Sequence, residues 1–575
     1  MENALEISNL SLELKQDNQW KPILHHVSFN LRRGETLGIV GESGSGKSVT
    51  ALSVMQLLNR GISRYPNGSI RFWNPQQETP TELIGCTDQQ MQHIRGRKIA
   101  MIFQEPMTSL NPVLRCGDQI TEQILLHTKL TKEQAKARVI ELFNEVMLPR
   151  PEQIFSSYPH EISGGQKQRV MIAMAMSCQP DILIADEPTT ALDVTVQKGI
   201  LQLIRRLQAK YGMSVLFITH DLGVVAEIAD RVLVLYKGEI VEQGHIRDLF
   251  QCPQHPYTQG LLACRPSMDV RLKKLPTVSD FLQQKQNLTD VMTSLTVTQQ
   301  ERDHFHQQLY ANEPLITIRH LNKLYPVRKK KLFEKRQHVN ALQDINLEIY
   351  EGETLGLVGE SGCGKTTLGR SMIRLIEPTD GEVCYKGKNL MALNARQLRT
   401  IRKDLQIILQ DPYSSLNQRL TIGDAIMEPM KIHSIGHNDR ERKERALALL
   451  SRVDLNENHF YRYPHEFSGG QRQRISIARA LAVNPRFIIC DESVSALDVS
   501  VQAQVLNLLN ELKNEYHFTY IFISHDLSVV RFMSDRIAVM QMGKIVELGD
   551  ADEICNHPQT DYTRKLIDAI PRISF

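Results

Sequence analysis

The chain has 575 residues, too many for one hydrophobic core when a globular domain takes about 150 residues. Its 68 basic and 65 acidic residues nearly cancel to a net charge of +3, so composition carries no electrostatic signature for nucleic acid. With 41% hydrophobic and 23% charged residues, the composition is typical of a folded globular protein and excludes disorder of the whole chain.

Targeting segments and cysteines give further limits. The first residues, MENALEISNLSLELK, lack the basic segment and apolar core of a signal peptide. No apolar run approaches the ~20 residues that cross a bilayer, so we expect a chain without its own membrane span that stays in the cytoplasm. The nine cysteines are scattered and never form a Cys-x-x-Cys pair, which indicates a reducing compartment and neither zinc nor an iron–sulfur cluster.

Short apolar runs and helical segments alternate along the first half of the chain. The runs are TLGIV at 36–40, KIAMIF at 98–103, ILIAD at 182–186, SVLFIT at 214–219 and RVLVLY at 231–236, and a helical pattern covers 195–211. This alternation predicts an α/β domain. Because the runs end at polar or glycine-rich motifs, we expect these motifs at the carboxyl ends of strands, where open α/β sheets bind ligands.

The whole pattern occurs twice. GETLGIVGESGSGKS at 34–48 returns as GETLGLVGESGCGKT at 352–366, and YPHEISGGQKQR at 158–169 returns as YPHEFSGGQRQR at 463–474. Each copy is long enough to bury its own core, so the repeat indicates tandem duplication of a domain. We expect one domain at 1–265, a second at 313–575, and between them a polar, Gln-rich linker at 266–312.

Each copy contains a P-loop pattern between an apolar strand and a helical run. Its glycines let backbone N–H groups surround phosphates, its lysine reaches the β- and γ-phosphates, and its last hydroxyl binds Mg²⁺. A chance glycine-rich turn would match about once per hundred such chains, so two matches at equivalent positions leave that alternative little weight. The predicted nucleotide-binding residues are Gly41, Glu42, Ser43, Gly44, Ser45, Gly46, Lys47 and Ser48, and Gly359, Glu360, Ser361, Gly362, Cys363, Gly364, Lys365 and Thr366.

A strand that ends in two carboxylates follows each P-loop. ILIADEP ends in Asp186 and Glu187, and FIICDES ends in Asp491 and Glu492. Such a pair is usually only a strand leaving the core, but its place after a P-loop favours a function. The aspartate can hold Mg²⁺, and the glutamate can polarise the attacking water as a general base.

Two further polar side chains follow apolar runs in each copy. Gln104 and Gln410 can ligate Mg²⁺ and the attacking water, while His220 and His525 can hydrogen-bond the γ-phosphate. Taken singly, each would more often be an ordinary polar residue at a strand end. Their common order along both copies indicates one site, in which we expect all four to take part in catalysis.

The order of P-loop, glutamine, SGGQ, DE strand, ALD and histidine resembles the ATP-binding cassette family over essentially the whole chain. The resemblance implies, in each cassette, a RecA-like α/β core, an antiparallel β subdomain and a helical signature subdomain. It also implies that the SGGQ signature of one cassette caps the ATP held by the P-loop of the other. The signature residues are Ser163, Gly164, Gly165 and Gln166, facing the second P-loop, and Ser468, Gly469, Gly470 and Gln471, facing the first.

The resemblance extends to the seam between the cassettes, where Asp193 in TALD and Asp498 in SALD should lie. One departure from the family is Ser493, which replaces the proline present as Pro188 in the first copy. This position is not a ligand, so we expect a change of shape and not of chemistry.

A second departure concerns the aromatic residue that stacks on adenine. Tyr325 stands at this place in the second copy, whereas the matching position of the first copy is Leu14. Trp20 could stack on adenine in the first copy instead. Because the two hairpins differ in length, the stacking residue of the first copy stays open.

Local segments resemble the oligopeptide, dipeptide and nickel importers within the family. They are EPMTSLNP at 105–112 and DPYSSLNQ at 411–418, where a permease's coupling helix docks in that group, and HPYTQGLL at 255–262 with its weaker echo HPQTDYTRKL at 557–566. The resemblance implies an ATP-hydrolysing subunit that powers a membrane transporter, and this transporter would import peptides, glutathione or a nickel chelate. Its cofactors would be ATP and Mg²⁺, and its partners two transmembrane permease subunits and an extracytoplasmic solute-binding protein, at the cytoplasmic face of the inner membrane.

Two other functions stay open. The motifs fit the ATPase of an exporter as well as that of an importer. A twin-cassette protein acting on ribosomes or DNA is a weaker alternative, since such proteins usually lack the histidine and have a charged helical linker. The basic run at 328–331 is interpreted as the solvated tip of a strand hairpin.

Overall fold

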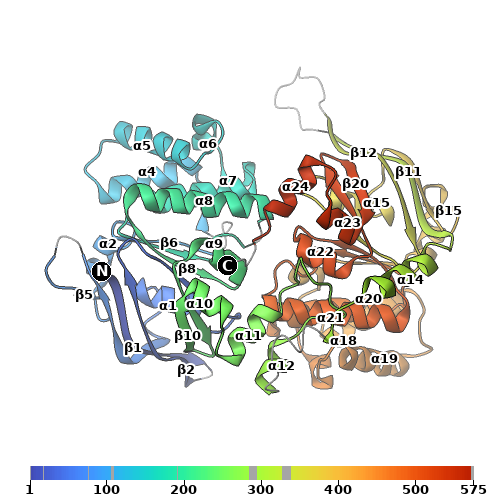
Figure 1. Ribbon diagram of the computed structural model, residues 1–575, viewed down its shortest axis with the longest axis horizontal. Coiled ribbons are helices and arrows are strands. Elements are labelled where there is room, and N and C mark those ends of the chain that lie inside the picture. The colour runs from blue at the N-terminus through green and yellow to red at the C-terminus, as the bar shows by residue number, and fades with distance from the viewer. Residues whose placement is uncertain are drawn as a thin grey trace.

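The computed structural model describes residues 2–16, 18–74, 77–104, 109–190, 192–283, 294–326 and 338–571. The basic run at 328–331 and residues 105–108 of the first glutamine segment lie outside these ranges. Figure 1 shows two lobes side by side, the first coloured blue to green and the second yellow-green to red. Each lobe combines β-sheets with helices packed around them.

A six-stranded sheet forms the centre of each lobe, in the order β10-β9-β3-β8-β7-β6 and β16-β17-β18-β13-β19-β20. All neighbours are parallel except β9–β10 and β19–β20, which close one edge as antiparallel pairs. The central strands are buried on both faces, which explains their unbroken apolar sequences. The strands are β3 (Thr36–Val40), β6 (Ile99–Ile102), β7 (Ile182–Asp186), β8 (Ser214–Thr219), β9 (Arg231–Tyr236) and β10 (Glu239–His245), then β13 (Thr354–Val358), β16 (Leu405–Ile408), β17 (Phe487–Asp491), β18 (Thr519–Ile523), β19 (Arg536–Gln541) and β20 (Lys544–Asp550).

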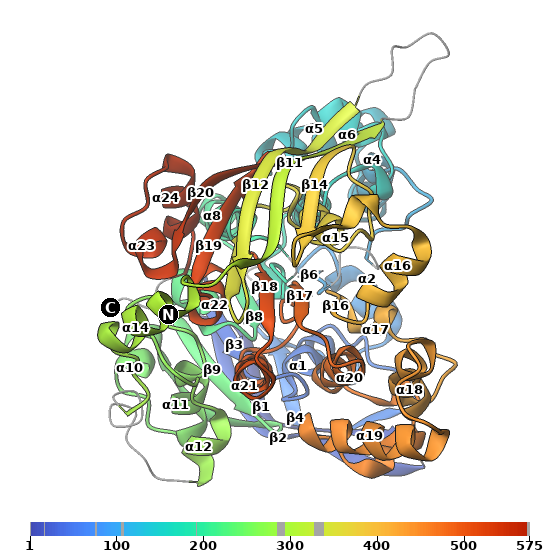
Figure 2. The ribbon, with the colours of Figure 1, turned by 90° about the vertical axis from the view of Figure 1, so that its right-hand side faces the viewer.

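A four-stranded antiparallel sheet lies against each core, in the order β2-β1-β4-β5 and β12-β11-β14-β15. In Figure 2 strands β11, β12 and β14 lie above the core strands β17 and β18, and the helices α18, α19 and α20 lie below them. These strands are β1 (Asn3–Gln16), β2 (Gln19–Arg32), β4 (Ser63–Phe72) and β5 (Thr81–Glu82), then β11 (Pro314–Pro326), β12 (His338–Tyr350), β14 (Asp380–Tyr385) and β15 (Lys388–Asn389).

Helices surround the sheets and form a separate helical subdomain in each lobe. Their ends follow local chemistry: α8, for example, begins where the Asp193 side chain accepts a hydrogen bond from Val196 N–H, and it ends at Gly212 with φ 66°. The first lobe contains α1 (Lys47–Val54), α2 (Asp88–Ile94), α4 (Cys116–His127), α5 (Lys132–Glu145), α6 (Pro151–Ser156), α7 (Gly164–Met176), α8 (Val194–Tyr211), α9 (Leu222–Ile228), α10 (Ile246–Gln251) and α11 (Pro256–Ala263). The second contains α15 (Lys365–Met372), α16 (Ala395–Ile401), α17 (Pro412–Ser415), α18 (Ile422–Ile432), α19 (Asp439–Arg452), α20 (Gly469–Leu481), α21 (Val499–Tyr516), α22 (Leu527–Met533), α23 (Ala551–Asn556) and α24 (Asp561–Asp568).

The two lobes confirm the predicted fold class, two tandem α/β domains with an antiparallel sheet and a helical subdomain each. The motif residues follow the core strands as expected, with β3 ending just before Gly41, β7 ending at Asp186 and β8 ending just before His220. Among the described residues, no helix is both long and apolar enough to pass through a bilayer.

The segment at 266–312, predicted as a linker, packs on the second lobe over part of its described residues, while Val278 lies against Gly260 of the first lobe. We call residues 266–283 and 294–312 the strap. It contains α12 (Val278–Gln283) and α14 (Gln299–Leu309). Leu272, Leu275 and Val278 are buried in one apolar cluster with side chains of both lobes. Asn507 of α21 holds the backbone of Leu275 through two hydrogen bonds, each 2.8 Å. The domain boundaries at 265 and 313 stay a prediction.

A buried arginine ties α14 of the strap to the second lobe. Arg302 of α14 is 6% exposed, and its guanidinium pairs with the carboxylate of Asp550 at 2.7 Å and with that of Asp552. In the first lobe the residue that ends the last core strand is His245, and the one two residues later is Arg247. The two carboxylates that pair with Arg302 are thus replaced by a histidine and an arginine at these positions of the first lobe, so an arginine buried there would lack this pair.

Candidate ATP sites

The P-loop of each lobe has a backbone shape that only glycine adopts easily. Gly46 and Gly364 precede α1 and α15 with φ of 107° and 111°, in the left-handed region. A Cβ atom on Gly46 would lie 2.6 Å from the side chain of Leu24, and one on Gly364 would lie 2.5 Å from the carbonyl oxygen of Ala341. The loop can therefore turn its N–H groups inward at the start of the helix.

The P-loop lysine is held inside this turn. Lys47 Nζ donates to the carbonyl oxygens of Gly41 (2.7 Å) and Glu42 (2.8 Å), and Lys365 contacts the equivalent oxygens of its own loop. Burial lowers the pKa of Lys47, while nearby carboxylates, Glu187 first, oppose this change. A buried ammonium group at the start of a helix can bind phosphate oxygens.

A hydroxyl and a carboxylate meet beside each P-loop. Ser48 Oγ donates to Asp186 Oδ1 at 3.1 Å, and Thr366 Oγ1 donates to Asp491 Oδ1 at 2.9 Å. Burial raises the pKa of Asp186 to about 6, although the hydrogen bond from Ser48 lowers it, and burial likewise raises the pKa of Asp491. Oxygen ligands of this kind fit Mg²⁺, and a divalent cation would favour the ionised carboxylate.

Glu187 is the centre of the first site. Its φ of 47° is unusual for a residue with a side chain, and its N–H donates to the carbonyl oxygen of Ile218 at 2.9 Å. The carboxylate accepts hydrogen bonds from Gln104 Nε2 (2.9 Å) and Thr190 Oγ1 (2.9 Å), and His220 Nδ1 lies 3.3 Å from Oε1. Burial raises the pKa of Glu187, but the opposing effect of His220 and Lys47 is stronger and lowers the pKa to about 2. The carboxylate is therefore ionised at neutral pH.

The second site repeats the arrangement with one difference. Gln410 Nε2 donates to Glu492 Oε2 at 2.7 Å, His525 Nδ1 lies 3.8 Å from the same oxygen, and φ of Glu492 is 48°. Ser495, at the place of Thr190, donates to the carbonyl oxygen of Glu492 and not to its carboxylate. Thr190 was not identified from the sequence. The only sign of its contact with Glu187 was a hydroxyl group three residues after the glutamate.

The second P-loop opens on a cavity of about 680 Å³. All residues along its wall belong to the second lobe, including Gln410 and Glu492 next to the P-loop and several residues at the start of β12. A space of this size beside the lysine and the glutamate can take a nucleotide. The wall is formed by His338, Val339, Asn340, Ala341, Gln343, Ser361, Gly362, Gly364, Lys365, Thr366, Thr367, Gln410, Glu492, Met542 and Gly543.

Tyr325, the predicted adenine-stacking residue, lies on the strand beside the one that lines this cavity. Tyr325 pairs with Val339 on the neighbouring strand and is 37% exposed, while His338 at the start of β12 lines the cavity. In the first lobe Trp20 stands near the start of β2, at the place of His338, and the guanidinium of Arg64 lies 4.5 Å from its ring. Tyr325 as the adenine-stacking residue stays a prediction, and Trp20 is the aromatic side chain at the equivalent end of the first hairpin.

Each signature motif begins a helix by a reciprocal cap. Gln166 N–H donates to Ser163 Oγ (3.3 Å) and Ser163 N–H donates to Gln166 Oε1 (3.0 Å), and Ser468 and Gln471 repeat both bonds before α20. Ser163 and Gly164 are exposed, and neither forms part of the wall of the cavity at the second P-loop. The cap that each signature should place over the opposite ATP stays a prediction.

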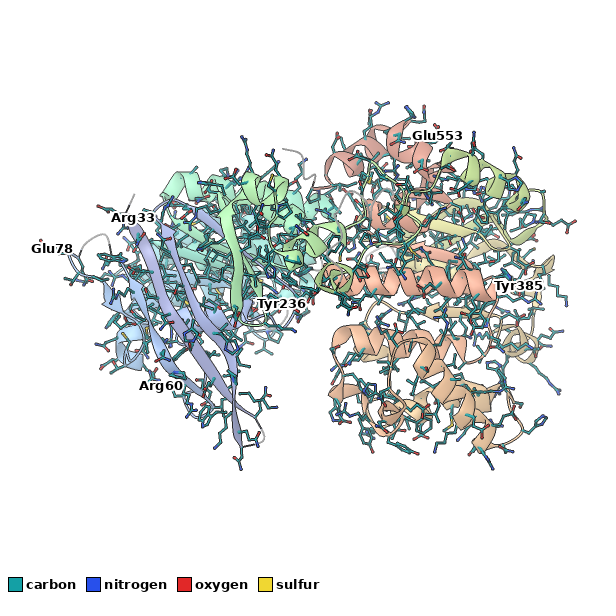
Figure 3. All side chains as sticks on the ribbon, turned by 60° about the horizontal axis from the view of Figure 1, so that its bottom comes forward. Arg33, Arg60, Glu78, Tyr236, Tyr385 and Glu553 are labelled. Atoms are coloured by element: carbon teal, nitrogen blue, oxygen red, sulfur yellow. The ribbon has the colours of Figure 1, made fainter. Side chains whose placement is uncertain are left out.

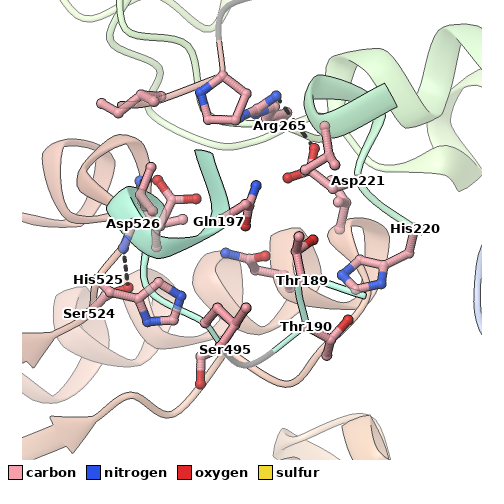
Figure 4. Close-up of a pocket in the computed structure, with 18 of the residues that line it drawn as sticks. Thr189, Thr190, Gln197, His220, Asp221, Arg265, Ser495, Ser524, His525 and Asp526 are labelled. Carbon is pink, nitrogen blue, oxygen red and sulfur yellow. Dashed lines mark hydrogen bonds and ion pairs between the residues drawn. The ribbon is translucent and has the colours of Figure 1, made fainter. Parts of the chain in front are cut away.

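The seam aspartates, Asp193 and Asp498, form hydrogen bonds to the opposite lobe. Asp498 accepts a hydrogen bond from Ser43 N–H at 2.9 Å, and Asp193 accepts one from Ser361 N–H at 3.3 Å. Between them lies a cavity of about 100 Å³ whose wall includes both site histidines, His220 and His525 (Figure 4). The two sites therefore face each other across a shared contact.

The duplicated P-loops, hydroxyl–carboxylate pairs and ionised glutamates define a protein of two ATP-hydrolysing cassettes. The family model described as ABC transporter matches residues 24–190 and 342–495, and the chain belongs to this family, as an ATPase that powers transport. A second model, described as the C-terminal region of oligopeptide/dipeptide transporters, matches residues 241–289 and 546–575. The resemblance seen in the sequence is thereby confirmed, including its importer group.

Relatives over nearly the full length point to one kind of transporter. The chain is 48% identical to the glutathione import ATP-binding protein GsiA of Salmonella choleraesuis (strain SC-B67), covering 99% of this chain and 90% of that protein. It is 47% identical to GsiA of Escherichia coli (strain K12), with the same two coverages, and 46% identical to that of Pectobacterium atrosepticum, covering 99% and 89%. A solved dimeric ATP-binding cassette bound to ADP and Pi covers 41% of this chain and 98% of its own at 31% identity, with a TM-score of 0.38.

Proposed function

We propose that the chain is the ATP-hydrolysing subunit of an importer for glutathione or other small peptides. The observation that carries this proposal is that both cassettes keep a full set of site side chains and are each followed by a C-terminal region of the oligopeptide/dipeptide transporter type. The glutathione import relatives support the cargo class. We expect two permease subunits and an extracytoplasmic solute-binding protein as partners, and a position at the cytoplasmic face of the inner membrane.

Each side chain of the site would have a separate role in ATP hydrolysis. The P-loop amides and lysine bind the phosphates, and Ser48, Asp186 and Gln104 would hold Mg²⁺, which withdraws charge from phosphate oxygens when bound. Glu187 is ionised, so it can take a proton from the attacking water. His220 beside it can donate to a phosphate oxygen. The second site uses the equivalent residues.

An apolar cavity beside the first glutamine supports a permease partner. It has a volume of about 200 Å³, and its wall includes Met101, Phe103, Met171 and Met174. Phe103 directly precedes Gln104 and is 39% exposed. Methionine-rich walls adapt to an inserted side chain, so a helix of the permease seated here would act directly on the position of the glutamine.

Reconstitution tests the proposed function. The chain would be purified with the permeases encoded beside it and placed in liposomes with ATP on its own side. We expect uptake of labelled glutathione or a short peptide that depends on ATP and on the solute-binding protein. Movement of solute in the opposite direction would favour an exporter, and sedimentation with ribosomes without any permease would contradict the proposal.

Magnesium binding should depend on pH through Asp186. Below its pKa of about 6 this carboxyl group is protonated and neutral, so it binds Mg²⁺ poorly, and the raised pKa of Asp491 acts in the same direction. We expect the affinity for ATP in the presence of Mg²⁺ to fall as the pH is lowered from about 8 to about 5, measured with a fluorescent nucleotide. In Asp186→Asn/Asp491→Asn, or with the metal chelated, this fall should become smaller, leaving the part that comes from protonation of ATP itself; an unchanged fall would contradict the assignment.

A further inference from the structure

In both lobes a tyrosine from the C-terminal region contacts the P-loop. Tyr257 on α11 accepts a hydrogen bond through its hydroxyl oxygen from Glu42 N–H at 2.9 Å, across 215 residues of sequence. Tyr562 on α24 accepts the equivalent bond from Glu360 N–H at 3.0 Å, across 202 residues. The same helix of the same region thus reaches the same P-loop atom twice.

The first tyrosine is firmly packed. Tyr257 is fully buried, and its ring lies 4.2 Å from that of Tyr236, which ends β9 and is labelled in Figure 3. Tyr562 is only half-buried, and it packs against an apolar cluster to which both lobes contribute. In both lobes the ring fixes the place of the hydroxyl, so the bond to the P-loop needs little further ordering.

The helix that carries each tyrosine is tied to the core sheet. Glu242 of β10 accepts hydrogen bonds from the backbone N–H groups of Gln254 (2.8 Å) and His255 (3.1 Å), directly before α11. Glu547 of β20 accepts the equivalent bonds before α24, at 2.8 and 3.2 Å. Both tyrosines are therefore placed by the rigid edge of the sheet.

The next amide of each P-loop is held from the other side. Ser43 N–H and Ser361 N–H donate to the seam aspartates of the opposite lobe, Asp498 and Asp193. Two successive N–H groups of the loop are thus occupied, one by the C-terminal region of its own cassette and one by the facing cassette. Two residues further on, Ser45 N–H donates to the carbonyl oxygen of Glu42 at 3.1 Å and Cys363 N–H donates to that of Glu360 at 3.2 Å, so the first turn of each loop is also closed by a bond of its own.

We propose that Tyr257 and Tyr562 are positioning residues for ATP binding, each fixing the first turn of its P-loop through one hydroxyl group. Without the hydroxyl oxygen, the N–H of Glu42 or Glu360 loses its acceptor, and the loop gains freedom to turn its amides away from the phosphates. The C-terminal region then acts on the ATP site of its own cassette. This inference rests on ATP hydrolysis at the two sites and is independent of the transported solute.

The double variant Tyr257→Phe/Tyr562→Phe tests the inference in the full chain, because it keeps both rings and removes both hydroxyl groups. We expect the KM for ATP and the Kd of a fluorescent ATP analogue to rise about 3- to 10-fold, and kcat to change less than about twofold. The melting temperature without nucleotide should stay unchanged, whereas the increase on adding ATP should shrink.

A matched control is Tyr236→Phe, which removes the hydroxyl group from the ring next to Tyr257 and should leave the KM unchanged. An unchanged KM in the double variant would overturn the inference, and so would an equal rise in Tyr236→Phe. Loss of stability without nucleotide would show that the hydroxyl groups act on folding and would overturn it too. A wild-type chain that fails to hydrolyse ATP would contradict the proposed function instead.

Discussion

Replacing Glu187 and Glu492 together by glutamine should leave ATP binding intact and lower turnover by about 100-fold or more. The amide keeps the size of the side chain, but it cannot accept the proton that the ionised carboxylate is placed to take. Binding of a fluorescent nucleotide and release of phosphate, both measured on the full chain, separate the two effects. Undiminished hydrolysis in the double variant would refute the general-base assignment.

The single variants test whether both sites work. Since Gln104 and Gln410 contact their glutamates in the same way, we expect each site to hydrolyse ATP and each single variant to lose part of the turnover. A single variant with full turnover would mark its site as inactive. Glu239→Gln, an exposed glutamate at the start of β10, serves as a control that should behave like the wild type.

Replacing Arg302 by methionine should release the strap from the second lobe. The change removes a buried cation from the carboxylates of Asp550 and Asp552, and breaking such a pair costs about 3 to 5 kcal/mol. We expect a lower melting temperature and faster hydrogen exchange at the backbone N–H of Leu275, which Asn507 protects in the wild type.

The strap also offers the matched control. Lys273 pairs with Glu301 at 2.9 Å, but both side chains are about half exposed, at 54% and 52%. Such a pair contributes little, so Lys273→Ala should change stability by less than about 1 kcal/mol. Equal effects of the two substitutions, or none from Arg302→Met, would show that the buried charges do not hold the strap in place.

Short contiguous motifs explain why so much could be predicted from the sequence. A phosphate site needs glycines, a lysine and a hydroxyl at fixed spacing, and carboxylates at the next strand end. Gly46, Lys47 and Asp186 are therefore recognisable without coordinates, and their repetition revealed the two cassettes. The structure then brought Gln104, Glu187 and His220 within hydrogen-bonding or ion-pairing distance, as their order along the chain had indicated.

Two features could not be predicted because they depend on contacts between distant residues. The strap looked like a linker because its composition is polar, and only the position of Asp550 and Asp552 beside Arg302 showed where it docks. The bond from Glu42 N–H to Tyr257 joins residues 215 positions apart and uses a backbone atom, which leaves no pattern in the sequence.

The sequence by itself determined the family and the two cassettes, and it predicted the residues that would meet the phosphates, since this chemistry is encoded in local patterns. Only the tertiary structure decided how the cassettes are joined and what supports each P-loop. The physical reason is that a hydrogen bond to a backbone N–H, or a buried ion pair, depends on which surfaces meet. That depends on the packing of the whole chain.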